Sequence, residues 1–379
     1  MPVMSDSLRK TSVMQLVYSL QVGGSEKLAC DISTHLDRGL FTPFVCALDV
    51  DGDLARDLTR ENIEHHVFRR KGVAPEVFRE LYRYIKTRRI DIVHTHHFTQ
   101  LWFAALPARL AGARIIHTEH EFFSYGESLF SRAMIKPLSG LCHRVTAVGP
   151  EVAEYFVRTI GMPREHVSVI PNGVDLTKFN YDPKPVREEL GLSKDHLVIG
   201  TVGRLEPEKD QKTLLEAFRY VKEKQSAARL VIVGNGRMAD ELKVHAKRLG
   251  VAGHTLFLGT RRDVPRVLSA MDLFALPSVR EGLPISLIEA MAAGKPVVAS
   301  DIGSVRDLIR HEDNGLLVEP GDAVTLSNSL LRLLDSSSLR EGMGNRGRRL
   351  AERSYGLPAM IRAYEGLYRS ASGMGHVRD

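Results

Sequence analysis

Two glutamates stand eight positions apart in a region rich in glycine, proline and small apolar residues. Glu281 lies in a turn-forming segment, whereas Glu289 falls in a stretch with helical spacing. Because the neighbours of Glu289 are small or apolar, a helix face turned toward solvent explains this residue poorly. A buried carboxylate is costly unless hydrogen bonds satisfy it, and sugar hydroxyls are suitable donors. The pair therefore indicates a site for a ligand rich in hydroxyl groups.

Two cations, Arg204 and Lys209, follow an apolar segment that we expect to be a strand. An arginine fork and a lysine point charge that converge on one place can hold a diphosphate. A solvated charged loop is the alternative, because Glu206 and Glu208 nearly cancel the two positive charges.

A glycine pair, Gly23 and Gly24, follows the first predicted strand and opens a predicted helix. Glycine lets the backbone approach a ligand closely, and a helix N-terminus offers unpaired N–H groups to an anion. A tight turn that binds nothing explains the same residues.

Histidines gather near the ends of two successive predicted strands. His117 and His120 lie at one of them, and the group from His94 to His97 lies at the other. Clustered imidazoles can bind a metal ion. The other interpretations are core residues and residues that line a substrate site, and we expect His94–His97 to be structural or to line the acceptor side.

Short β-branched segments alternate with helical patterns along nearly the whole chain, which is typical of parallel βαβ units. The polar, proline-containing segment 171–185 is the best predicted boundary between domains. We expect one Rossmann-like domain over residues 1–175, a second over 176–354, and a helix over about 355–379 that packs back on the first. Doubly wound sheets bind ligands at the carboxyl ends of their strands, so a cleft between two facing domains is expected. The predicted strands are 13–18, 43–48, 90–94, 114–118, 145–148, 167–170, 197–202, 229–233, 255–258, 272–275, 296–299 and 315–318.

Composition excludes several classes of protein. The chain has 379 residues, 43% hydrophobic and 26% charged, with a net charge of +6, which is ordinary for a globular protein. No uninterrupted apolar run is long enough to span a membrane. Three cysteines without a CxxC pair favour a reducing, cytoplasmic setting over a disulfide framework. The charge favours anionic ligands, but no basic stripe with interleaved aromatics points to nucleic acid.

Taken together, these motifs make the sequence similar to a family 4 glycosyltransferase of the GT-B fold. The matching pieces occur in the family's order, and they are Gly23-Gly24, His117-Thr-Glu-His120, Pro171-Asn-Gly-Val-Asp175, Gly203-Arg204 with Lys209, and Glu281 with Glu289. One departure lies after the next predicted strand, where Asp301-Ile-Gly303-Ser-Val-Arg-Asp307 carries a single glycine and an aspartate at the acidic position.

The resemblance implies a role for each matched residue. Arg204 and Lys209 would hold the diphosphate of the donor, Glu289 would bind the ribose, and Glu281 would contact the transferred sugar. His120 would lie beside the anomeric carbon, so His120 and Glu281 are the expected catalytic residues. Donor binding is further expected at Gly23, Gly24, Gly282, Leu283, Pro284 and Ile285.

The resemblance also implies the reaction. A sugar would move from a UDP-, GDP- or ADP-sugar to a glycan or lipid-linked acceptor, with retention of configuration and without a metal or other cofactor. Residues 176–354 would form the donor-binding domain and residues 1–175 the acceptor side, and the pathway would be cell-surface polysaccharide or glycolipid synthesis. Front-face attack by the acceptor is favoured over a covalent intermediate on Glu281. The alternatives are a nucleotide-sugar epimerase or hydrolase that needs no acceptor, and a silent nucleotide-sugar binding protein.

Contact with a membrane is a further hypothesis, at the inner face of the cell membrane. The segment 122–136 combines aromatic and basic residues, as interfacial helices do, and Arg69-Arg70-Lys71 could reach anionic headgroups. A core helix and a solvated charge run explain both features more simply.

Overall fold

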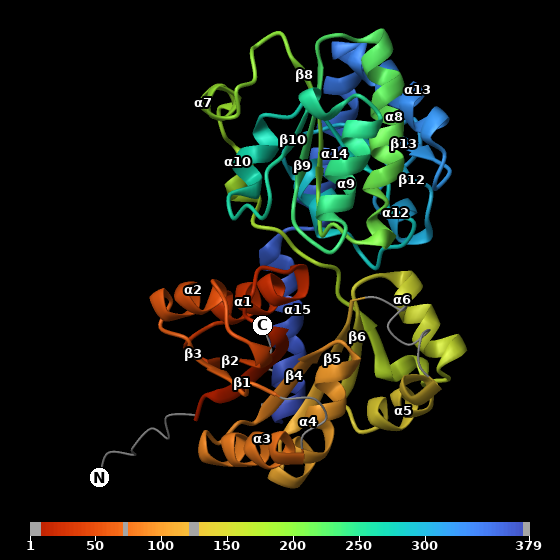
Figure 1. Ribbon diagram of the computed structural model, residues 1–379. Helices are drawn as coiled ribbons and strands as arrows, with labels where there is room; N and C mark the ends of the chain where they lie inside the picture. Colours follow the sequence, from red (N-terminus) through yellow and green to blue (C-terminus); the bar gives the residue numbers. More distant parts are fainter. Residues whose placement is uncertain (1–8, 71–74, 121–128, 374–379) are drawn as a thin grey trace. The chain divides into compact units, whose positions relative to one another are not determined.

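The chain divides into two compact units, each built on a parallel sheet (Figure 1). The computed structural model describes residues 9–70, 75–120 and 129–373. Unit 1 combines the chain up to Asn172 with the chain from Met360 onward, and unit 2 spans Gly173–Ala359. Among the described residues, no helix is both long and apolar enough to cross a membrane.

Unit 1 contains a seven-stranded sheet in the order β3-β2-β1-β4-β5-β6-β7, with every neighbouring pair parallel. The sequence analysis missed β3, because Glu64-His-His-Val has neither an apolar run nor a clean alternation. It also placed β4 two residues too early. The strands are β1 (Thr11–Ser19), β2 (Phe41–Val50), β3 (Glu64–Val67), β4 (Ile92–His96), β5 (Arg114–Glu119), β6 (Arg144–Ala147) and β7 (Val167–Val169).

Helices connect these strands, as right-handed crossovers between parallel strands require. The last helix of the chain, α15, packs against strands of unit 1: Gln15 in β1 donates through Nε2 to the hydroxyl of Tyr368 at 2.9 Å. The ring of Tyr368 also makes an edge contact with Phe41 in β2. The helices of unit 1 are α1 (Gly24–His35), α2 (Leu54–Arg60), α3 (Pro75–Thr87), α4 (Phe98–Ala111), α5 (Leu129–Ser139), α6 (Pro150–Glu154) with a π-helical turn (Tyr155–Thr159), and α15 (Leu357–Ser372), which begins at the end of unit 2.

Unit 2 contains a six-stranded parallel sheet in the order β10-β9-β8-β11-β12-β13. Its strands are β8 (Leu197–Val202), β9 (Ala228–Val233), β10 (Thr255–Phe257), β11 (Leu273–Leu276), β12 (Val297–Ser300) and β13 (Gly315–Val318). Its helices are α7 (Pro183–Glu189), α8 (Gln211–Lys224), α9 (Ala239–Arg248), α10 (Val264–Ser269), α11 (Ile285–Ala292), α12 (Gly303–Arg306), α13 (Ala323–Leu334) and α14 (Ser337–Ser354).

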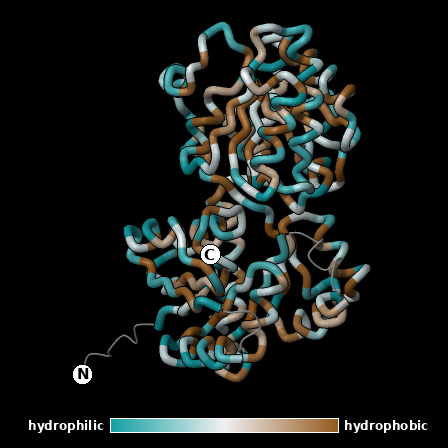
Figure 2. Tube along the Cα trace, in the orientation of Figure 1, coloured by the Kyte–Doolittle hydropathy of each residue, from teal (hydrophilic) through white to brown (hydrophobic). Residues whose placement is uncertain are grey.

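The strands carry the core of each unit. Most strand residues are buried on both faces, as expected for a parallel sheet covered by helices on both sides. Hydrophobic residues accordingly follow the strands through the interior of both units (Figure 2). In unit 2 an apolar cluster includes Phe218 of α8, Leu330 of α13 and Met343 of α14, all without solvent exposure.

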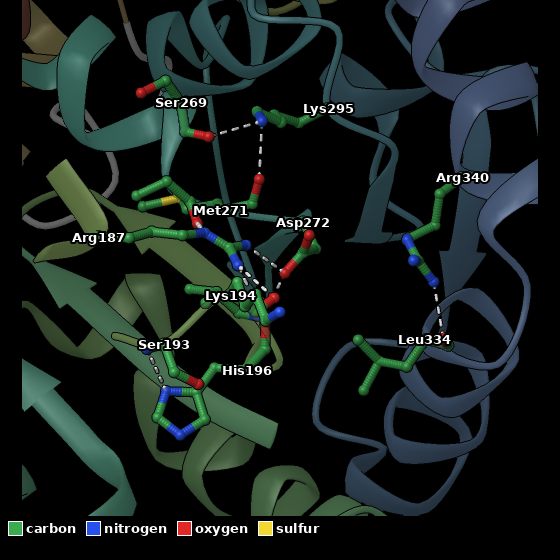
Figure 3. A network of polar contacts seen from close by, with 12 residues as sticks. Arg187, Ser193, Lys194, His196, Ser269, Met271, Asp272, Lys295, Leu334 and Arg340 are labelled. Atoms are coloured by element: carbon green, nitrogen blue, oxygen red, sulfur yellow. Dashed lines mark hydrogen bonds and ion pairs between the residues drawn. The ribbon is translucent and has the colours of Figure 1, made fainter. Parts of the chain in front are cut away.

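A polar network fastens α7 to the amino end of the second sheet (Figure 3). Nη2 of Arg187 contacts Oδ2 of Asp272 at 2.7 Å, and the same oxygen accepts from the backbone N–H of Val198 at 2.7 Å. Nearby, Nζ of Lys295 donates to the carbonyls of Met271 and Ser269 at 2.7 and 3.0 Å. Burial lowers the pKa of Lys295 to about 8. These charges lie at the edge opposite the carboxyl ends of the strands, so they stabilise the fold there.

The chain enters and leaves unit 2 side by side. Val174 forms a parallel bridge with Gly356. The N–H of Val174 donates to the carbonyl of Tyr355 at 2.9 Å, and the N–H of Leu357 donates to the carbonyl of Val174 at 2.9 Å. The first and last segments of unit 2 are thus held together by the backbone itself.

Candidate functional site

Each sheet has one point at which the strand order reverses, and the candidate residues follow the strands at these points. In unit 1 the reversal lies between β1 and β4, and in unit 2 it lies between β8 and β11. Loops at such a switch point separate and leave room for a ligand at the carboxyl edge. Arg204 and Lys209 come after β8, and Glu281 comes after β11.

The loops after β8 and β11 are joined by backbone and side-chain contacts in unit 2. The N–H of Val279 donates to the carbonyl of Glu208 at 2.9 Å. Nζ of Lys209, at the end of the 3₁₀ turn Pro207–Lys209, contacts Oε2 of Glu281 at 2.7 Å. The structure therefore brings together two of the predicted residues that are 72 positions apart in the chain.

Further hydrogen bonds hold Glu281 from both sides. Its Oε1 accepts from the hydroxyl of Ser278 at 2.6 Å, and its backbone carbonyl accepts from the hydroxyl of Ser304 at 2.9 Å. The side chains of Lys209 and Glu281 are 16% and 6% exposed, so the pair is nearly dry and its geometry is fixed. Such preorganised charges interact more strongly with a bound ligand than charges in water do.

Arg204 behaves differently from Lys209. Its side chain is 57% exposed, and its Nη2 lies 3.4 Å from Oε1 of Glu208. The backbone carbonyl of Arg204 accepts from Nε2 of Gln211 at 2.9 Å, which anchors the loop while the guanidinium reaches outward. The solvated-loop interpretation thus describes the side chain of Arg204 better than that of Lys209.

Helix α11 begins directly after the Glu281 loop. Pro284 is its N-cap residue and Ile285 its first residue, while Gly282 and Leu283 are buried in the preceding turn. Glu289 lies inside this helix and is 5% exposed. Its burial agrees with the expectation that Glu289 is not a solvent-facing residue.

The segment that departs from the family pattern also reaches this site. Helix α12 begins at Gly303, and its Ser304 supplies the hydroxyl that holds the carbonyl of Glu281. Asp301 instead forms an ion pair with Arg306 through Oδ1 and Nε at 2.6 Å. The single glycine therefore starts a helix whose next residue supports Glu281.

In unit 1 the glycine pair opens α1. Gly23 is the N-cap residue in an extended conformation, and Gly24 is the first helical residue. Oε2 of Glu26 accepts from the hydroxyl of Ser25 at 3.0 Å, and this carboxylate lies where a side chain on Gly23 would stand. A residue larger than glycine at position 23 would displace Glu26 from the helix N-terminus.

The histidines in and directly after β4 and β5 form one cluster, which is buried except for the partly exposed His97. Nε2 of His120 lies 2.9 Å from Nδ1 of His96, and the ring of His97 lies 4.8 Å from that of His120. His117 is fully buried, and its Nδ1 lies 3.0 Å from the hydroxyl of Thr95. Among the described residues, no group of three or more His, Cys, Asp or Glu side chains is placed to hold a metal ion.

Glu119 lies next to His97 and His117 and has no solvent exposure. Burial raises the pKa of Glu119, but the nearby imidazoles of His117 and His97, 3.7 and 3.3 Å from its carboxylate oxygens, outweigh it and bring that pKa down to about 2. Its Oε1 also accepts from the backbone N–H of His120 at 3.0 Å. Burial lowers the pKa of His120 well below its ordinary value, as it does for His96. The cluster therefore holds an ionised carboxylate near the neutral imidazoles of His96 and His120.

The structure describes only part of the segments on which the membrane hypothesis rests, and Lys71 lies outside the described residues. Residues 122–128 of the aromatic segment lie outside the described residues, and α5 covers 129–139. Arg70 is engaged within unit 1, because its Nη2 pairs with Oδ2 of Asp49 at 2.7 Å and its side chain is only 16% exposed. Its guanidinium also lies over the ring of Phe103 at 5.1 Å. The basic run therefore does not present Arg70 to a headgroup.

Sequence reasoning missed the residues that support the predicted ones. Ser278 and Ser304 hold Glu281, and Gln15 and Tyr368 belong to the hydrogen-bonded network around His96. Ser278 could have been suspected, because it lies three positions before a buried carboxylate. The other three carry no local signal, since their partners are distant in the chain.

Comparison with known proteins places the chain among sugar-transferring enzymes. Residues 22–178 match the model described as Glycosyltransferase Family 4, and residues 183–350 match that described as Glycosyl transferases group 1. The UDP-Gal:alpha-D-GlcNAc-diphosphoundecaprenol alpha-1,3-galactosyltransferase of Escherichia coli is 33% identical over 271 residues, which cover 68% of this chain and 70% of that protein. A GDP-mannose-dependent alpha-(1-6)-phosphatidylinositol monomannoside mannosyltransferase of Mycobacterium tuberculosis is 29% identical over 286 residues, or 70% and 74% of the two chains.

Solved structures show the same fold. The crystal structure of Anabaena HepE in complex with UDP-glucose superposes with a TM-score of 0.85 at 24% identity, covering 95% of this chain and 99% of that one. The two parallel α/β sheets thus have the GT-B arrangement expected from the sequence. The chain belongs to the family 4 glycosyltransferases, which are nucleotide-sugar-dependent enzymes of the GT-B fold.

Proposed function

We propose that this glycosyltransferase moves a hexosyl group from a nucleoside diphosphate sugar to a lipid-linked or glycan acceptor, with retention of configuration and without a metal ion. The observation that carries the proposal is the buried contact between Lys209 and Glu281 at the carboxyl edge of the second sheet. A cation and a carboxylate fixed side by side suit a ligand that has a diphosphate next to a sugar.

The donor is assigned to unit 2. Lys209 and Arg204 interact with the diphosphate, and the N–H groups at the start of α11 add partial positive charge. Glu281 orients hydroxyls of the transferred sugar, and Glu289 accepts hydrogen bonds from the ribose. Negative charge that develops on the leaving diphosphate is thus met by groups of the protein itself.

His120 of unit 1 is proposed to contact the transferred sugar near its anomeric carbon. Its buried, neutral imidazole can exchange hydrogen bonds with a hydroxyl without adding charge to the reacting centre. The acceptor attacks from the face that the diphosphate leaves, because no second carboxylate is assigned to form a covalent intermediate.

Relatives suggest the chemical class of the acceptor. The E. coli relative is named for a diphosphoundecaprenol-linked N-acetylglucosamine, and the mycobacterial one for a phosphatidylinositol monomannoside. Both acceptors are lipid-linked, so we propose a lipid-linked saccharide here and synthesis of a cell-surface polysaccharide or glycolipid as the pathway. Peripheral contact with the inner face of the cell membrane is part of this proposal, and helix α4 is the element that we assign to it.

The donor proposal is tested by thermal unfolding with UDP, GDP, UDP-galactose, UDP-glucose, GDP-mannose and ADP-glucose, since a ligand of the native state raises the midpoint. For the ligand that stabilises most, Arg204→Ala should weaken binding about 10- to 100-fold, because a charged hydrogen bond is worth about 1.5–3 kcal/mol. Because the side chain of Arg204 is exposed, this variant should keep its fold.

Lys212→Ala is the matched control, because Lys212 is an exposed lysine in the first turn of α8. Its loss should leave donor affinity within about twofold. Equal affinity in wild type and Arg204→Ala would overturn the diphosphate assignment. Release of free sugar in the presence of a diphospholipid-linked N-acetylglucosamine, with no transferred product, would favour a hydrolase.

A further inference from the structure

A line of buried hydrogen bonds connects the last helix of the chain to His120. The hydroxyl of Tyr368 in α15 accepts from Nε2 of Gln15 at 2.9 Å. Oε1 of Gln15 lies 2.8 Å from Nε2 of His96, and Nδ1 of His96 lies 2.9 Å from Nε2 of His120. Gln15, His96 and Tyr368 have no solvent exposure, and His120 is 8% exposed.

The amide of Gln15 gives this line a direction. Its Oε1 can only accept, so Nε2 of His96 must carry a proton. A neutral imidazole has one N–H, which leaves Nδ1 of His96 as an acceptor. That nitrogen in turn requires a proton on Nε2 of His120, and Nδ1 of His120 then keeps its lone pair.

Tyr368 fixes the orientation of the Gln15 side-chain amide. Because its hydroxyl accepts from Gln15, its own proton is directed to Nδ1 of His94 at 2.7 Å. Nε2 of His94 then donates to the hydroxyl of Thr118, also at 2.7 Å. Each group in this branch therefore has one role for this orientation of the amide. A reversed amide would reverse every role along the line and place the proton of His120 on Nδ1.

Burial supports the assumption that the imidazoles are neutral. It lowers the pKa values of His94, His96 and His120 well below the ordinary value of about 6.5. At neutral pH each ring is then in one of two tautomers, and its hydrogen bonds decide which.

We propose that Gln15 and Tyr368 are positioning residues that act through His96 to hold His120 in the tautomer protonated at Nε2. In this state Nδ1 of His120 is an acceptor for a substrate hydroxyl. The inference rests on the role proposed above for His120. It also assigns a function to α15, because this helix sets the protonation pattern of the site residue that directly follows β5.

The test is NMR of the protein labelled with ¹⁵N and ¹³C in histidine, because the two ring nitrogens have different shifts in the two tautomers. The His120 signals are identified by their loss in His120→Asn. Wild type should show His120 protonated at Nε2 alone. Gln15→Met removes the acceptor for His96, and Tyr368→Phe removes the hydroxyl that fixes the Gln15 amide. Each variant should show His120 as a mixture of its two tautomers.

Kinetics separate positioning from a purely structural role. With the donor that stabilises most and a diphospholipid-linked N-acetylglucosamine acceptor, both variants should lower kcat at least about tenfold. The KM for the donor should change by less than about twofold, since the residues assigned to donor binding are untouched.

Tyr364→Phe is the matched control. Tyr364 lies one turn before Tyr368 and is equally buried, but its hydroxyl contacts Thr118 at 3.2 Å and lies outside the line to His120. This variant should lose similar thermal stability while keeping the tautomer of His120 and kcat.

Three results would overturn the proposal. They are a wild-type His120 protonated at Nδ1, an unchanged tautomer in both Gln15→Met and Tyr368→Phe, and a loss of kcat in Tyr364→Phe as large as in Tyr368→Phe. The NMR experiment needs no substrate. An inactive wild-type enzyme with the expected tautomer would therefore refute the proposed function and leave the hydrogen-bond line intact.

Discussion

At the scale of single residues, the sequence points to groups that do chemistry better than to groups that hold them. Lys209 and Glu281 each stand in a distinctive segment, so both were predicted. Their direct contact was not, because it depends on two loops that meet only at the edge of a folded sheet. Gln15 is a single polar residue inside an apolar strand, and its partner Tyr368 is 353 positions away. No local pattern could pair them.

The buried histidines predict a dependence of stability on pH. In the folded protein the pKa values of His94, His96 and His120 lie well below 6.5, whereas in the unfolded chain they lie near 6.5. Below that pH the unfolded chain binds more protons than the folded one. Stability is therefore full above about pH 6.5 and is lost as the pH falls below it.

The size of this loss follows from linkage. Between pH 7.5 and 5.5 each neutral buried histidine can remove at most about 1.4 kcal/mol, which sets an upper limit of about 4 kcal/mol for the three together. Urea unfolding at the two pH values measures it, and fluorescence of the single tryptophan, Trp102, reports unit 1 alone.

A variant and a second pH window sharpen this test. In His94→Gln, the slope of the free energy of unfolding against pH should correspond to about one bound proton fewer than in wild type. The lowered pKa of Glu119, about 2, adds a separate loss only as the pH falls from about 4.5 toward 2. A free energy of unfolding that is equal at pH 7.5 and 5.5 would contradict the neutral cluster.

At the scale of elements, the sequence predicted most strands and helices because parallel strands read as apolar runs between helical patterns. The predicted strands 197–202 and 315–318 agree with β8 and β13 in every residue. Strand β3 was not predicted, because it lies at the sheet edge, where a strand is less buried and can consist of polar residues. Residues 150–159, whose sequence has a helical pattern, form α6 followed by a π-helical turn at Tyr155–Thr159. A pattern with a period of 3.6 residues does not distinguish these two kinds of helix.

Helix α4 gives a prediction of its own. Leu106 and Leu110 are 57% and 65% exposed and lie one turn apart, on the side that continues to Trp102. Phe130 of α5 is 51% exposed and packs on Trp102 with ring centres 4.8 Å apart. An exposed apolar stripe beside Arg109 suits an anionic lipid surface.

Flotation with vesicles of phosphatidylglycerol and phosphatidylcholine tests this surface. Leu106→Gln combined with Leu110→Gln should weaken binding at least about tenfold, since two buried leucines are worth a few kcal/mol. Val244→Gln combined with Val324→Gln, two exposed residues of unit 2, is the control and should bind as wild type does. Absence of wild-type binding at both low and high salt would end the membrane proposal.

At the scale of the whole molecule, α15 makes unit 1 dependent on the end of the chain. Truncation after residue 359 removes Tyr364 and Tyr368, two fully buried side chains, and loss of a large buried aromatic costs about 3–5 kcal/mol. The sum approaches the whole stability of an ordinary domain. We expect unit 1 to lose its cooperative Trp102 transition and unit 2 to keep its protection against hydrogen exchange.

Truncation after residue 373 is the control for this experiment, since it leaves all of α15 in place. Protection that disappears from both units together in the shorter protein would show that they do not fold independently. The same measurement tests the domain boundaries that the sequence suggests near residues 175 and 354.

The bridge between Val174 and Gly356 has a consequence for engineering and for evolution. Both junctions of unit 2 lie within one pair of hydrogen-bonded segments, so this unit is topologically an insertion. If the corresponding unit of a relative is inserted at these two points, the two chain ends that join it to unit 1 keep their short separation. If the donor binds to unit 2 as proposed, recombination at one site in space, although at two in the gene, would exchange the sugar nucleotide and leave the acceptor-binding residues of unit 1 untouched.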